Sequence, residues 1–359
     1  MLLPDVRGAR QKAVSAIRKA RLGIYALTHF CVDFACFYML FAWYSSETHS
    51  AQTVTIGFLA YNVIAFGLQP IIGYLCDTHG KIPIEVIGCP LLIAGLPLMR
   101  VPAASILLMG LGNACFHIAG GIDSLRFSGG KMARSGVFVS TGALGVAFGS
   151  LAGKSGSLPM YFPIGALSLC LFLLYAFCYR PREMKPVFAK TAFATVKPEL
   201  KFGKAVFLVS VSIFVRSYAG AILPADWRTT SVLFVFPAIG AFIGKAAGGF
   251  AADWLGARNT SVISLLAAMA MLAFGYMNPW LYLTGMILFN MNMSVTLCAI
   301  ASKLPAHPGL AFGITTLALL CGNIPTFFLA IKPAPPVFAA LTAISAACLY
   351  HALKKGRAL

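Results

Sequence analysis

The stretch GYLCDTHGK (Gly73–Lys81) lies where an apolar run meets a charged corner, and GGFAADWLGAR (Gly248–Arg258) repeats the same arrangement later in the chain. Each copy has glycine four residues before an aspartate and a basic residue after it. Placing Asp77 over Asp253 separates the two copies by about half the chain length. This repetition indicates that the chain consists of two related halves.

The composition indicates a membrane protein. Of the 359 residues 59% are hydrophobic and only 11% are charged, and the mean hydropathy is +0.83; a soluble domain has about 25% charged residues. A span needs about 20 mostly apolar residues, and the apolar runs give twelve candidates. We place them at 22–45, 52–75, 83–99, 102–122, 135–153, 159–179, 205–223, 231–251, 259–277, 280–302, 309–330 and 336–353. In lipid such spans are helices, and the runs lack the alternation of a membrane barrel.

The net charge is +18, and the basic residues are distributed unevenly between the two sides of the predicted spans. Twenty-two of the 28 basic residues fall in segments on one side, and four fall on the other. This asymmetry predicts cytoplasmic N- and C-termini in a plasma or inner membrane, and not nucleic-acid binding. The two remaining basic residues, Arg216 and Lys245, lie within predicted spans.

The polar segments divide the chain. We expect a basic N-terminal segment (1–21), a six-helix bundle (22–179), a cytoplasmic linker (180–204), a second six-helix bundle (205–353) and a basic tail (354–359). The first segment suits a helix lying on anionic lipid, and a disordered basic tail fits it equally well. The ten cysteines show no CxxC spacing and are interpreted as reduced packing residues. We expect no cofactor, no metal site and a monomer.

The repeat extends to buried polar residues. Gln69 and Lys245 stand eight residues before the two aspartates, and an overlay of the first span of each half places Asp33 opposite Arg216. Two repeated six-helix halves joined by a basic loop, with binding sites at the midplane between them, are typical of one class of secondary carriers.

The repeated phrase resembles the loop motif of the major facilitator superfamily. Residues that match it in the first half are Gly73, Asp77, Gly80 and Lys81, and those in the second half are Gly249, Asp253, Gly256 and Arg258, the last one place late. Thr78 and Ile82 stand where the family usually has basic residues. The resemblance implies an all-α integral membrane protein whose twelve transmembrane helices form two pseudo-symmetric six-helix bundles.

For these eight residues the resemblance implies a gate on the cytoplasmic side. Asp77 can accept hydrogen bonds from the amino end of a neighbouring helix, where the dipole favours negative charge. Gly73 would allow close approach and Gly80 the turn. The alternative is that the phrase only marks a loop corner, and for Lys81 a topological role suffices.

Buried charges are the candidate transport residues. His29, Asp33 and Cys36 share one helix face, and an unpaired charge there would cost about 3 kcal/mol. Because the family's first and seventh helices face each other, the resemblance implies an Asp33–Arg216 pair near the midplane. A static salt bridge that only orders the packing is the alternative. Cations at Arg216 and Lys245 favour an anionic or zwitterionic ligand, unless Lys245 snorkels to the surface.

Further polar residues add to this site. Asn113 and His117 share a face of the fourth span, and Gln69 and Tyr61 are additional substrate-binding candidates. We assign proton coupling to Asp33, His29 and His117, because histidine titrates near neutral pH; a hydrogen-bonded core histidine is the alternative. Other residues that could line a cavity are Asn290, Asn292 and Asn323.

Glycines recur at every fourth position in two spans. They are Gly145, Gly149 and Gly153 in the fifth span and Gly240, Gly244 and Gly248 in the eighth. Small residues at this spacing let helices pack closely in lipid, and the resemblance implies that these two helices meet between the halves. The fifth span lacks the proline of the family's antiporter pattern, which argues against export by antiport.

The sequence therefore predicts a secondary active transporter that moves a small organic anion or zwitterion by alternating access, coupled to protons. One alternative is a membrane protein on a carrier fold that transports nothing, such as an assembly factor or sensor. Another is a drug or antibiotic exporter of the same superfamily, because GLGNACFHIAGG (Gly110–Gly121) resembles fosmidomycin-resistance-type exporters over this short stretch. An enzyme is not expected, since no HExxH, P-loop or GxSxG motif is present.

Overall fold

The computed structural model describes residues 6–44, 50–79, 82–179, 191–224, 227, 230–329 and 335–356, without the side chains of residues 6–15, 44, 231 and 232. The helices of the first half are α1 (Val6–Tyr44), α2 (Ala51–Asn62), η1 (Val63–Gly67), α3 (Gln69–Thr78), α4 (Ile84–Gly95), η2 (Leu96–Arg100), α5 (Pro102–Arg126), α6 (Met132–Ser155), α7 (Tyr161–Leu173) and η3 (Leu174–Cys178). Those of the second half are α8 (Phe202–Ile222), α9 (Ser231–Phe234), α10 (Phe236–Leu255), α11 (Ala257–Phe274), α12 (Pro279–Asn290), α13 (Asn292–Lys303), α14 (Pro308–Asn323), η5 (Ile324–Phe327) and α15 (Pro335–Ala352).

The predicted membrane architecture is confirmed. Within the described residues, ten helical segments are long and apolar enough to cross a membrane. The other two predicted spans, 83–99 and 231–251, fall on α4 with η2 and on α9 with α10. Each predicted span thus coincides with a helix or with consecutive helical segments.

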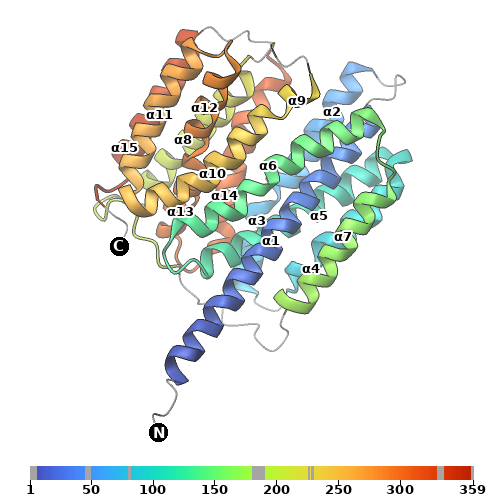
Figure 1. Cartoon of the computed structure of the whole chain (residues 1–359), viewed down its shortest axis with the longest axis horizontal. Coiled ribbons are helices and arrows are strands. Elements are labelled where there is room, and N and C mark those ends of the chain that lie inside the picture. The colour runs from blue at the N-terminus through green and yellow to red at the C-terminus, as the bar shows by residue number, and fades with distance from the viewer. Residues whose placement is uncertain are drawn as a thin grey trace.

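The helices form two bundles that lie side by side (Figure 1). In the first bundle α1 packs along α6, and α4 packs along α5. In the second, α10 packs along α12, and α15 packs against α8 and α11. The bundles meet mainly where α6 contacts α10 and where α3 contacts α14. These two contacts are equivalent under the repeat, because α3 and α10 each end in a copy of the repeated phrase.

The outer surface is apolar, as lipid requires. Phe274 is 83% exposed and Trp280 is 68% exposed, whereas Asp33, Asn113 and Arg216 are buried. The core is also mainly apolar, and these polar side chains are buried within it. Buried polar and charged groups in a membrane protein are the first candidates for a function.

Two spans are interrupted near polar residues. The second span runs α2–η1–α3, and its π-helical turn ends just before Gln69 and Pro70, the first residues of α3. Proline has no N–H to donate to the preceding turn, so the helix can change its pitch there without losing that bond. The tenth span breaks at Met291, between α12 and α13.

The glycine stripes correct one prediction. Positions for a Cβ at Gly145 and Gly149 lie 2.4 and 2.3 Å from the carbonyl oxygens of Phe30 and Phe34 in α1. Equivalent positions at Gly244 and Gly248 lie 2.2 and 2.0 Å from carbonyl oxygens of the tenth span, those of Ile287 and Met291. The stripes therefore bring helices together within each bundle, not across the interface.

Other glycines of the same two helices make the contact between the bundles. A Cβ at Gly136 would lie 2.7 Å from the carbonyl oxygen of Lys245, and one at Gly249 would lie 2.6 Å from that of Met132. The fifth and eighth spans do meet across the interface, as expected, but through a glycine near the start of α6 and a glycine in the copy of the repeated phrase at the end of α10.

The segments outside the bundles are partly described. Residues 6–21 form the first part of α1, which projects beyond the bundle (Figure 1). In the predicted linker, Thr191 N donates to Pro305 O at 2.8 Å and Lys197 N donates to Ala352 O at 3.1 Å. Residues 180–190 lie outside the described part of the chain. The second part of the linker is thus attached to the second bundle.

Candidate functional site

A cavity of about 420 Å³ lies between the two bundles. The first bundle contributes His29, Asp33 and His117 to its wall, and the second contributes Arg216 and Lys245. These five residues are all among the predicted substrate or proton-coupling residues. The cavity therefore has a wall that carries a carboxylate and a facing wall that carries two cations.

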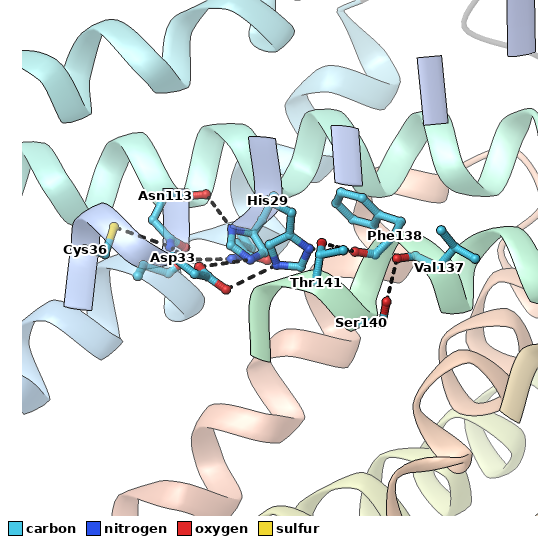
Figure 2. A network of polar contacts seen from close by, with 11 residues as sticks. His29, Asp33, Cys36, Asn113, Val137, Phe138, Ser140 and Thr141 are labelled. Carbon is cyan, nitrogen blue, oxygen red and sulfur yellow. Dashed lines mark hydrogen bonds and ion pairs between the residues drawn. The ribbon is translucent and has the colours of Figure 1, made fainter. Parts of the chain in front are cut away.

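Asp33 faces two neighbouring histidines, His29 and His117, whose ring centroids are 4.6 Å apart; Figure 2 shows Asp33 beside His29. Its Oδ2 is 3.3 Å from Nε2 of His29, one turn earlier on α1, and its Oδ1 is 3.8 Å from Nε2 of His117 on α5. His29 Nδ1 lies 2.7 Å from the carbonyl oxygen of Phe138, and His117 Nδ1 lies 3.0 Å from that of Asn113. A carbonyl oxygen can only accept a hydrogen bond, so both Nδ1 atoms carry hydrogen. The Nε2 atom of each ring faces the carboxylate of Asp33.

Two neighbours complete this group. Asn113 Nδ2 donates to Asp33 Oδ1 at 3.1 Å and holds the carboxylate from behind the cavity wall. Gly142 on α6 covers another side: a Cβ there would lie 2.3 Å from Asp33 Oδ2 and 2.4 Å from His29 Nε2. Any residue other than glycine would displace the Asp33–His29 pair. Sequence reasoning missed Gly142, because its contact with α1 has no local signal.

The predicted Asp33–Arg216 pair is not present. The carboxylate of Asp33 lies beside the two histidines of its own bundle, and Arg216 Nη2 donates to Thr296 Oγ1 at 3.3 Å on α13. The Nε atom of Arg216 is buried and has no hydrogen-bond partner among the described residues. The prediction was wrong about the contact because an overlay of hydropathy fixes depth in the membrane and not the direction of a side chain. Both groups nevertheless line the same cavity.

The remaining candidates divide into two sets. Asn290 and Asn323 line the cavity. Tyr61, Gln69 and Asn292 are fully buried and lie outside its lining: Gln69 donates to Ala65 O at 2.7 Å, and Asn292 donates to Ser264 Oγ at 3.1 Å. These three occupy packing positions in this structure.

Sequence reasoning also missed one polar pair in the cavity wall. Thr315 and Thr316 on α14 line the cavity, although each hydroxyl donates to a carbonyl of its own helix. Threonines with such bonds are common in membrane helices, so their type alone gives no signal.

The first copy of the repeated phrase joins the bundles. Asp77, at the end of α3, is fully buried; Gly309 N donates to its Oδ1 at 3.1 Å and Leu310 N to its Oδ2 at 2.9 Å. These are orphan amides at the start of α14, where the helix dipole favours a negative charge. Arg126 Nη2 lies 3.7 Å from the same carboxylate.

The second copy makes the same contact in the opposite direction. Met132 N and Ala133 N, at the start of α6, donate to the carboxylate of Asp253 at 2.8 and 3.1 Å. We call these two carboxylate–helix contacts, Asp77 with α14 and Asp253 with α6, the latches. Each joins one bundle to the other.

The other predicted gating residues stand around the latches. Gly73 touches the backbone of Gly309, and Gly256 adopts a positive φ of 88° at the start of α11. Arg258 lies over the ring of Tyr350, 4.7 Å from its centroid. Gly80 and Lys81 lie outside the described residues.

The latches lie to one side of the cavity. They lie at the end of the bundles that carries the chain's N-terminal segment, which we call the basic end. On α14 the cavity lining begins at Phe312, beyond the residues that contact Asp77, and extends to Asn323 at the far end of the helix. On α8, which starts at the basic end, the lining residues Arg216, Ser217 and Gly220 lie in the second half of the helix. The cavity is therefore located on the side of the latches away from the basic end.

No protein-family model matches the sequence. Among solved structures, the chain is similar to the human organic anion transporter MFSD10, with a TM-score of 0.65 and 12% identity over 93% of this chain and 99% of that one. It is similar to FucP, a Major Facilitator Superfamily transporter in the outward conformation, with a TM-score of 0.62 and 11% identity over 92% and 97% of the chains. It is also similar to a bacterial homologue of the iron transporter ferroportin in an outward-facing state, with a TM-score of 0.60 and 15% identity over 93% and 96%. The chain therefore has the multi-pass membrane fold of the major facilitator superfamily.

Proposed function

We propose that this protein is a secondary transporter that moves a small organic anion or zwitterion across the membrane by alternating access, coupled to protons. The observation that carries the proposal is the cavity between the bundles, with a carboxylate–histidine wall on one side and Arg216 and Lys245 on the other. Transport requires a central site that each half contacts separately, because the halves must move around the bound substrate.

The charges in the cavity support an anionic group on the substrate. Arg216 is 4% exposed, and its Nε atom has no protein partner among the described residues. A buried polar group without a partner costs about 1–3 kcal/mol, and more when it is charged. A carboxylate or similar anion in the cavity would satisfy this group. The opposite wall, with Asp33, suits a positive group of a zwitterion.

Two structural neighbours support separate parts of the proposal, the anionic substrate and the coupling to protons. One structural neighbour is described as an organic anion transporter, and another as a fucose:proton symporter. For this chain we assign the proton to Asp33, His29 and His117. A proton between a carboxylate and two imidazoles changes the charge of the first bundle's wall and therefore its attraction for a substrate.

The latches support alternating access. If the basic end faces the cytoplasm, as the distribution of basic residues predicts, the structure is closed towards the cytoplasm. For the cavity to open there, Asp77 and Asp253 must release the amides of α14 and α6. Alternating access by relative movement of the two bundles requires polar contacts on one side of the substrate site that can break and re-form.

The test is substrate uptake into proteoliposomes. Carboxylates and zwitterionic amino acids are first screened for a rise in the melting temperature of the purified protein, since selective binding stabilises the folded state. Uptake of the selected compound should be abolished by Arg216→Ala and partly retained by Arg216→Lys. Arg100→Ala is the matched control: it removes one exposed guanidinium at the end of η2, outside the cavity lining, and should leave uptake unchanged.

Unchanged uptake in a folded Arg216→Ala variant would refute the proposed substrate site. Coupling is tested separately with an imposed pH gradient, which should drive accumulation of the substrate in the wild type and not in Asp33→Asn. Accumulation that is indifferent to the gradient would remove proton coupling and leave the substrate site standing.

A further inference from the structure

We propose that His29, Asp33 and His117 form a binding site for a divalent first-row transition-metal ion in the wall of the cavity. The proposal goes beyond the function proposed above: the coupling proton was assigned to the same three residues, and an ion bound between them would take the place of that proton. All three residues belong to the first bundle, whereas the anion is assigned to Arg216 and Lys245 of the second.

The first argument is the direction of the donor atoms. Both imidazoles donate from Nδ1 to a backbone carbonyl, at 2.7 Å for His29 and 3.0 Å for His117. Their Nε2 lone pairs therefore point at the carboxylate of Asp33. Three electron-rich groups face one another in a buried place, an arrangement that is repulsive unless a proton or a metal ion lies between them. Metal-binding histidines are oriented in this way, with one ring nitrogen on a carbonyl and the other on the ion.

The second argument is distance. The three ligand atoms lie within 4.8 Å of one another, and the carboxylate oxygens are 3.3 and 3.8 Å from the two Nε2 atoms. Ligands about 2.0–2.2 Å from one ion are themselves roughly 3–4 Å apart. Small side-chain rotations would therefore bring all three atoms onto one ion.

The third argument is the support and the route. Asn113 Nδ2 holds Asp33 Oδ1 at 3.1 Å and so fixes the carboxylate from outside the ligand set. Although the three ligand residues are at most 7% exposed, each of them lines the cavity. An ion can therefore enter from the cavity, and water or a substrate can fill the remaining coordination positions.

The ligand types define the class of ion. Two imidazoles and one carboxylate suit Fe²⁺, Co²⁺, Ni²⁺ or Zn²⁺, whereas Mg²⁺ and Ca²⁺ prefer sites built of oxygen. The sequence grouped these three residues for proton coupling and predicted no metal site, because the ligand from α5 is distant from the other two along the chain and shows no metal-site spacing.

The test uses the full chain, purified without a histidine tag and titrated with Co²⁺, whose visible absorption reports nitrogen and oxygen ligands. The exposed Cys321 is replaced by serine throughout. We expect one saturable Co²⁺ site per chain, displaced by Zn²⁺ and not by Mg²⁺. His29→Ala and His117→Ala should each weaken it at least about tenfold, and His117→Cys, which restores a ligand, should recover part of the affinity. His351→Ala, on the last turn of α15, is the matched control and should bind like the parent.

A variant that fails to fold is recognised by its melting temperature without metal. Gly142→Ala then serves as a second test, because it keeps all ligands but places a methyl group between Asp33 and His29; we expect it to bind Co²⁺ more weakly. Absence of saturable binding in the parent protein would overturn the proposal. Unchanged binding in the double variant His29→Ala/His117→Ala would overturn it too, since the ion would then be held elsewhere. Neither result depends on transport.

Discussion

Asp77 and Asp253 each pair a buried carboxylate with backbone amides that have no partner in their own helix. A carboxylate that is withdrawn from water is costly, and the first amides of a helix have no partner within that helix. Each aspartate accepts two such amides from the other bundle. These hydrogen bonds offset the cost of removing the carboxylate from water only while the bundles stay together at the basic end. The contact therefore forms in one conformation and is lost when the bundles separate there.

We predict that Asp77→Ala opens the basic end. Loss of a helix cap costs about 0.5–2 kcal/mol, which would shift the balance between closed and open states by up to about thirtyfold. A cysteine introduced at Thr316, in the cavity wall, should react faster with a membrane-impermeant thiol reagent applied from the basic side. Asp253→Ala should act in the same direction. Thr78→Ala, the next residue on α3, is the control and should leave the rate unchanged.

The Arg126–Asp77 contact should matter less than the amides do. The two groups are 3.7 Å apart, and the arginine side chain is 19% exposed. Partly exposed ion pairs contribute about 0–1 kcal/mol. We therefore expect Arg126→Ala to change the labelling rate at least severalfold less than Asp77→Ala does. An equal effect would show that the ion pair, and not the helix amides, holds the latch.

The sequence predicted the partner of a side chain only where that partner is a feature common to all helices, such as the free amides at a helix start. Asp77 was expected to bind the amino end of a neighbouring helix, because any helix start offers free amides. Asp33 was paired with Arg216 on the overlay of the halves, yet His117 on α5 is the residue that reaches it. The direction of a side chain about its helix axis is set by packing with α5 and α6, which hydropathy does not report.

At the scale of helices, α3 and α14 approach each other through glycine. A Cβ at Gly73 would lie 2.2 Å from the carbonyl oxygen of Gly309, and one at Gly309 would lie 2.5 Å from that of Gly73. The two backbones therefore touch directly. This approach brings the amides of α14 to Asp77, so the latch depends on the absence of side chains beside it.

We predict that Gly73→Ala weakens the latch by separating α3 from α14. The added methyl group cannot fit against the backbone of Gly309, and the labelling rate at Thr316→Cys should rise as it does in Asp77→Ala. Gly23→Ala is the matched control: no atom lies within 4 Å of a Cβ at Gly23, and alanine is the better helix former by about 1 kcal/mol. This control should keep the parental rate and melt at the same or a higher temperature. A parental rate in Gly73→Ala would contradict the role of the close approach.

Element positions followed from the sequence more completely than element contacts did. The twelve apolar runs and the repeated phrase were enough for the spans and for the two halves, because length, hydropathy and charge determine membrane topology. The glycine stripes of α6 and α10 were assigned to the wrong neighbours. A period of four residues shows that a smooth face exists, but α1 and α12 cover those faces, and only the packed structure shows this.

For the whole molecule, the two latches are related by the repeat and run in opposite directions. Each bundle supplies one carboxylate and receives the other, so movement of one bundle relative to the other at the basic end would break both latches. The cavity lies beyond this end and between the same bundles. A relative rotation that breaks both latches would expose the cavity at the basic end, which links the residue-scale contacts to transport.

This model predicts that a covalent link across the basic end stops transport. The rings of Tyr74 on α3 and His307, which precedes α14, are stacked with centroids 6.2 Å apart. A cleavable cross-linker joining Tyr74→Cys to His307→Cys should therefore form readily, hold the basic end closed and abolish uptake, and cleavage should restore uptake. The control joins Tyr175→Cys to Tyr179→Cys, whose rings are 5.6 Å apart within the first bundle, and should leave uptake intact. If the first link formed fully and uptake continued, the bundles would not separate at this end, and alternating access through the latches would be refuted.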